Sequence, residues 1–110
     1  MFPGRKITAV FQPHLYTRTR DFHRGFAQAL SLADEVLLVP IYPAREEPIE
    51  GVSSDMIAEL LTVPHRTVPL EHIALETERA RPDILITFGA GNIENYTDEI
   101  ARRLLERPNE

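Results

Sequence analysis

The sequence has 110 residues, a hydrophobic content of 43%, no cysteine and a formal net charge of -5 at pH 7. This length allows one small domain with its own core, and the lack of cysteine excludes disulfides and thiolate metal sites. The acidic balance argues against a nucleic-acid partner, which requires a basic surface. A membrane partner is not predicted either, because no apolar run approaches the roughly 20 residues that span a bilayer, and the start does not resemble a signal peptide.

Short apolar runs alternate with segments of helical periodicity along the chain. In chain order we predict a turn at residues 1–4, a strand at 6–11, a helix at 21–32, a strand at 35–40, a long loop at 41–54, a helix at 55–61, an edge strand or extended connection at 62–68, a helix at 70–81, a strand at 83–88, a tight turn at 89–92 and a closing helix at 93–107. We expect Thr19 or Asp21 to cap the first helix and Ser54 to cap the second. The unbroken apolar run at 6–11 predicts a central strand that is covered on both faces. Because this strand lies so close to Met1, we expect elements that precede it in the domain to be missing.

Strands that alternate with helices predict an α/β domain over residues 1–110. We expect a three-layer, Rossmann-like arrangement with a mainly parallel sheet and right-handed crossovers. In such a sheet the loops after Phe11, Val39 and Phe88 leave the same edge. Open α/β sheets bind their ligands at that carboxyl edge.

The loop after Phe11 carries the strongest candidate for an anion site. Arg18 and Arg20 can each grip a carboxylate or phosphate with two parallel hydrogen bonds, and His14 can donate to the same anion. Arginine is unfavourable near a helix N-terminus, where the helix dipole prefers acids. This placement favours a binding role over a merely solvated one, more strongly for Arg18 than for Arg20 or Arg24.

The turn at residues 89–92 reads Gly89-Ala90-Gly91-Asn92 between a strand and a helix. It is either a plain tight turn or an anion site, because glycines let an anion approach the backbone. The dinucleotide fingerprint requires a third glycine where this chain has Glu94. In the long loop, Glu46 can serve a metal or an amine or simply face solvent, and the scattered histidines show no metal-ligand spacing.

Three motifs together resemble one family. Phe11-Gln12-Pro13-His14-x-Tyr16-Thr17-Arg18-Thr19 is similar to a signature of the third domain of the UDP-N-acetylmuramate–L-alanine ligases, a branch of the Mur ligase family. Tyr42-x-Ala44-x-Glu46-x-Pro48-Ile49-x-Gly51 and Gly89-Ala90-Gly91-Asn92-Ile93 resemble two later motifs of that domain. The family's Asp-Asp-Tyr-x-His-His-Pro segment is absent, and Leu15 stands where many members carry arginine.

The resemblance implies a cytoplasmic three-domain enzyme of peptidoglycan synthesis, of which this chain is the C-terminal domain. Such an enzyme uses ATP and Mg²⁺, held mainly by its central domain, to join L-alanine to UDP-N-acetylmuramate. This chain has no P-loop motif, so we expect it to be inactive alone and to hold no cofactor or metal. By resemblance, Arg18 and His14 are the catalytic candidates. The remaining implied contacts are Tyr16, Thr19, Arg20 and Glu46 for substrate, and Gly89, Ala90, Gly91 and Asn92 for an anion.

The sequence is also compatible with two other functions. One is a stand-alone α/β module that binds a small anion or nucleotide. The other is a structural role, in which the three loops form a surface for a partner.

Overall fold

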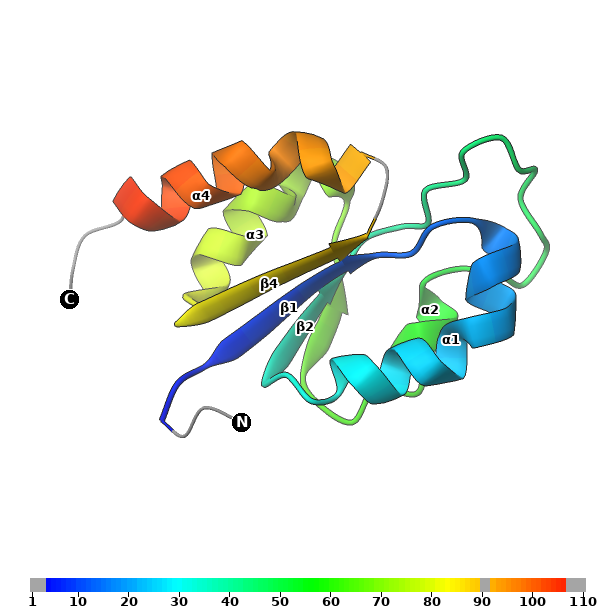
Figure 1. Cartoon of the computed structure of the whole chain (residues 1–110), viewed down its shortest axis with the longest axis horizontal. Helices are drawn as coiled ribbons and strands as arrows, with labels where there is room; N and C mark the ends of the chain where they lie inside the picture. Colours follow the sequence, from blue (N-terminus) through cyan, green and yellow to red (C-terminus); the bar gives the residue numbers. More distant parts are fainter. Residues whose placement is uncertain (1–3, 90–91, 107–110) are drawn as a thin grey trace.

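The structure, a computed structural model, describes residues 4–89 and 92–106. Within these residues one parallel sheet has the strand order β3-β2-β1-β4. Its strands are β1 (Ile7–Gln12), β2 (Glu35–Leu38), β3 (His65–Thr67) and β4 (Ile84–Gly89). Helices cover both faces, as Figure 1 shows, so the predicted three-layer α/β fold with a parallel sheet is confirmed.

Two layers of helices flank the sheet. Helices α1 (Tyr16–Leu30) and α2 (Asp55–Ala58) lie on one face, and α3 (Ile73–Ala80) and α4 (Thr97–Glu106) lie on the other (Figure 1). Short 3₁₀ turns, η1 (Leu70–His72) and η2 (Asn92–Tyr96), precede α3 and α4. No helix in the described part of the chain is both long and apolar enough to cross a membrane.

The two central strands supply a core on each face of the sheet. Val10 and Leu37 pack toward α3 and α4, whereas the alternate residues Ala9, Val36 and Leu38 pack toward α1 and α2. All five are at most 2% exposed. Burial on both faces explains why these strands read as continuous apolar runs rather than alternating ones, and it confirms that the first strand is central.

The strand order reverses between β1 and β4. The chain runs outward from β1 through β2 to the edge strand β3, then crosses by α3 to place β4 on the other side of β1. Gln12 and Gly89 are paired neighbours at the ends of these two strands. The segments that follow β1 and β4 therefore start side by side, at the switch point where doubly wound sheets bind ligands.

The start of α1 corrects one prediction. The helix begins at Tyr16, well before Asp21, and Leu15 occupies the N-cap position without a side-chain cap. Neither Thr19 nor Asp21 caps it. The exposed N–H groups are satisfied by a carboxylate from the long loop, a tertiary partner that local capping rules do not detect.

Most other boundaries agree with the predictions within two residues, but the helix predicted at 55–61 ends at Ala58. Ser54 does precede α2, but its hydroxyl donates to the Val39 carbonyl at 2.7 Å instead of capping the helix. The segment at 62–68 contains the short edge strand β3. The helices predicted at 70–81 and 93–107 each begin as a 3₁₀ turn, and residues 1–3, 90–91 and 107 of the predictions lie outside the described residues.

Candidate functional site at the carboxyl edge of the sheet

Parallel pairing continues beyond the ends of β1 and β2. His14 and Tyr42 form a bridge in which Tyr42 N–H donates to Pro13 O at 2.8 Å and Leu15 N–H donates to Tyr42 O at 2.9 Å. The His14 ring stacks on the Tyr42 ring, with centroids 5.7 Å apart and planes 16° apart. The half-buried imidazole is thus oriented by the loop that follows β2.

Leu15 turns the chain from the strand into α1. Its φ of 70° lies in the left-handed region that non-glycine residues rarely adopt. Its carbonyl accepts hydrogen bonds from Thr19 N–H at 3.2 Å and from the Thr19 hydroxyl at 2.8 Å. Thr19 is fully buried, so the structure uses this predicted substrate contact to hold the turn.

Glu46 reaches the N-terminus of α1 from the long loop. One carboxylate oxygen accepts the N–H groups of Tyr16 and Thr17, the latter at 3.1 Å, and the other accepts the Thr17 hydroxyl at 2.6 Å. The hydrogen bond from the Thr17 side chain is the main reason that the pKa of Glu46 lies below its usual value. The loop is therefore fastened to the helix by a charge-assisted cap, which also suits the helix dipole.

The two arginines of the predicted anion site differ in their surroundings. Arg20 pairs with Asp21 at 2.9 Å, and this hydrogen bond raises the pKa of Arg20. Arg18 is exposed and makes no hydrogen bond or ion pair with any described residue. Positions two apart on a helix lie about 200° apart around its axis, so the two guanidiniums leave different sides of α1. Arg18 is the one whose charge is available to a ligand.

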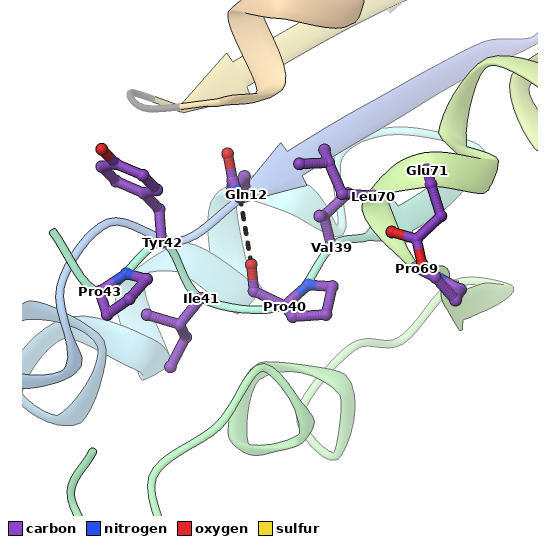
Figure 2. Close-up of a pocket in the computed structure, with 9 residues that line it drawn as sticks. All are labelled: Gln12, Val39, Pro40, Ile41, Tyr42, Pro43, Pro69, Leu70 and Glu71. Atoms are coloured by element: carbon purple, nitrogen blue, oxygen red, sulfur yellow. Dashed lines mark hydrogen bonds between the residues drawn. The ribbon is translucent and has the colours of Figure 1, made fainter. Parts of the chain in front are cut away.

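A hollow of about 490 Å³ opens at the carboxyl ends of β1, β2 and β3 (Figure 2). Gln12, residues 39–43 and residues 69–71 line it. Gln12 is only 3% exposed; its amide nitrogen donates to Pro40 O at 3.4 Å and its amide oxygen accepts Ile93 N–H at 2.9 Å. The sequence analysis ends the strand at Phe11 and names Gln12 only within the 11–19 motif, with no contact of its own. A polar side chain that closes an otherwise apolar buried strand was the signal that could have revealed it.

The predicted anion turn is described in part. Gly89 ends β4 beside Gln12, and Asn92 opens η2, while Ala90 and Gly91 lie outside the described residues. Anion binding at this turn therefore stays a prediction. Within residues 4–89 and 92–106, no three histidine, aspartate or glutamate side chains gather in a way that could hold a metal ion.

A parallel sheet with a strand-order reversal and polar loops at its carboxyl edge defines a Rossmann-like α/β domain. No family model matches the sequence. The chain is 48% identical over 101 residues to the UDP-N-acetylmuramate–L-alanine ligase of Cytophaga hutchinsonii. The aligned region covers 91% of the chain and 22% of that ligase.

Two further relatives with the same name agree with this match. The protein of Phocaeicola vulgatus is 50% identical over 102 residues, or 91% of the chain and 22% of that protein. The protein of Flavobacterium johnsoniae is 47% identical over 107 residues, or 96% of the chain and 24% of that protein. The chain is thus similar over nearly its whole length to the C-terminal part of UDP-N-acetylmuramate–L-alanine ligases, and it spans less than a quarter of their length.

Proposed function

We propose that this chain is the C-terminal domain of an ATP-dependent ligase that joins L-alanine to UDP-N-acetylmuramate in peptidoglycan synthesis. Its proposed task is to position the amino acid and the acyl phosphate while the amide bond forms. The observation that carries the proposal is the similarity to ligases of that name, at 48% identity over 91% of the chain for one of them. The placement of the 11–19 motif at the ligand-binding edge of the sheet supports it.

The proposed reaction brings anionic groups together. The amine of L-alanine attacks the acyl carbon of the phosphorylated lactyl carboxylate; the C–N bond forms, the C–O bond breaks as phosphate leaves, and the amine gives up a proton. We assign Arg18 to the anion, either the carboxylate of alanine or the acyl phosphate, because its guanidinium has no partner among the described residues. A fixed positive charge there lowers the electrostatic cost of the approach.

We assign His14 to positioning of the alanine. Stacking on Tyr42 holds its ring in one plane, so a ring N–H can be aimed at a bound carboxylate. Because Glu46 and Thr19 already make hydrogen bonds inside the domain, Arg18 and His14 are the side chains that we place against the substrate.

The sequence has no P-loop for ATP, and no cluster of metal ligands is found among the described residues. We propose that another part of the ligase polypeptide binds ATP and Mg²⁺. Since UDP sugar and ATP are cytoplasmic metabolites, we place the reaction in the cytoplasm.

The test is Arg18→Ala in a ligase that contains this domain. We expect the KM for L-alanine to rise, or kcat to fall, by at least about tenfold, the scale of a lost charge-assisted contact. Arg20→Ala is the matched control, because Arg20 is engaged with Asp21 on another side of the same helix. Wild-type kinetics in Arg18→Ala would remove Arg18 from the site.

A further inference from the structure

The buried side chain of Gln12 forms hydrogen bonds to two separate segments at the carboxyl edge of the sheet. Gln12 is the last residue of β1, and its side chain stands at the carboxyl edge of the sheet (Figure 2). On one side it donates to Pro40 O, in the segment that follows β2. On the other side it accepts Ile93 N–H, in η2, the next described element after β4.

A primary amide suits these two contacts, because it has a donor and an acceptor on the same planar group. The partners also determine which way the amide points, since a carbonyl can only accept and an N–H can only donate. Glutamate would keep an acceptor for Ile93 but would place a carboxylate against Pro40 O. Methionine, with nearly the same length, would leave both backbone groups without this partner.

We propose that Gln12 is a positioning residue that sets the spacing between the 40–43 segment and η2, the 3₁₀ turn at Asn92–Tyr96. These segments follow β2 and β4, the two strands that flank β1 in the sheet, and residues 40–43 line the hollow beside Gln12. Gln12 thereby fixes the position of the loop that carries Tyr42 relative to the ends of β1 and β4. Because His14 stacks on Tyr42, the position of the imidazole is fixed with it. Its effect on catalysis rests on the function proposed above, whereas its effect on the two backbone contacts does not.

Amide hydrogen exchange in the 110-residue chain tests the contacts. In Gln12→Met we expect the Ile93 amide to exchange at least about tenfold faster relative to the Val10 amide, which reports global opening. In Gln12→Glu the Ile93 amide should stay protected, because an acceptor remains. The control is Gln28→Met, at the chain's other glutamine, which is exposed on α1. Unchanged relative exchange at Ile93 in Gln12→Met would overturn the proposal.

A measurement on the unaltered chain covers the case in which a variant does not fold. A scalar coupling across the hydrogen bond should connect the Ile93 amide nitrogen to the Gln12 side-chain carbonyl carbon. A clear absence of this coupling would also contradict the proposal.

The kinetic readout uses a ligase that contains this domain. We expect both Gln12→Met and Gln12→Glu to raise the KM for L-alanine about tenfold more than they change kcat, while Gln28→Met changes neither. Equal and small effects in all three would leave Gln12 as part of the scaffold only and overturn the positioning role. If the ligase shows no alanine-dependent turnover before any substitution, the proposed function fails while the exchange result still decides the contacts.

Discussion

Thr17 donates its hydroxyl hydrogen to Glu46 Oε2 at 2.6 Å, although the two residues are 29 positions apart in sequence. This contact fastens the long loop after β2 to the first turn of α1, directly beside Arg18. It fixes where α1 begins and therefore the direction in which Arg18 leaves the helix. The carboxylate also occupies the helix N-terminus, so an incoming anion must be held by side chains rather than by the backbone of α1.

Glu46→Gln should destabilise the chain. The substitution keeps an acceptor for the helix N–H groups but removes the charge that strengthens these bonds and suits the helix dipole. We expect the midpoint of thermal unfolding to fall by on the order of a few degrees. Glu47→Gln, at the exposed neighbouring position, is the control and should change the midpoint little. Equal shifts in the two variants would contradict the capping role.

The contribution of Glu46 should depend on pH. Its folded-state pKa lies below the ordinary value of 4.5, chiefly because of the Thr17 hydroxyl. The stabilisation is therefore fully present above the unfolded-state pKa and is lost as the pH falls through the folded-state pKa. The difference in urea midpoint between the unaltered chain and Glu46→Gln should be constant above pH 4.5 and shrink at more acidic pH. A difference that persists in acid would rule out the charge as its source.

The isolated chain should bind neither ATP nor L-alanine tightly. It has no P-loop, and the proposed site is completed only by other parts of a ligase. Calorimetric titration of the chain with each compound should give no submicromolar affinity, and the chain should not hydrolyse ATP. Submicromolar binding of ATP would instead favour a stand-alone nucleotide-binding module, and alanine-dependent turnover by the chain would contradict the assignment to one domain of a larger enzyme.

Leu37→Ala should be among the costly core substitutions. Leu37 is fully buried in the central strand β2, and its truncation leaves a cavity between the sheet and α3. We expect a loss of about 2–5 kcal/mol in the free energy of unfolding, measured with urea. Leu105→Ala, at a side chain that is 86% exposed, is the control and should cost no more than about 0.5 kcal/mol. A small effect at Leu37 would contradict its place in the core between the sheet and α3.

Much of the architecture follows from local patterns in the sequence. Val36, Leu37 and Leu38 are consecutive apolar residues, and only a strand covered on both faces buries all three, so the central strands and the parallel α/β fold were predictable. The alternation of elements also placed three loops on one edge of the sheet. The candidate site could be located there because strand direction alone determines which loops meet.

The tertiary structure decided the contacts within that site. No local rule brings Glu46 to the start of α1, so the helix begins at Tyr16 rather than at a residue with a capping side chain of its own. The same holds for Gln12, whose partners come from segments after β2 and β4, and for Arg18, which stays without a described partner while Arg20 pairs with Asp21. Sequence periodicity reports which residues are buried, because burial repeats along an element. Hydrogen bonds between distant loops depend on the packed geometry, and only the folded chain reveals them.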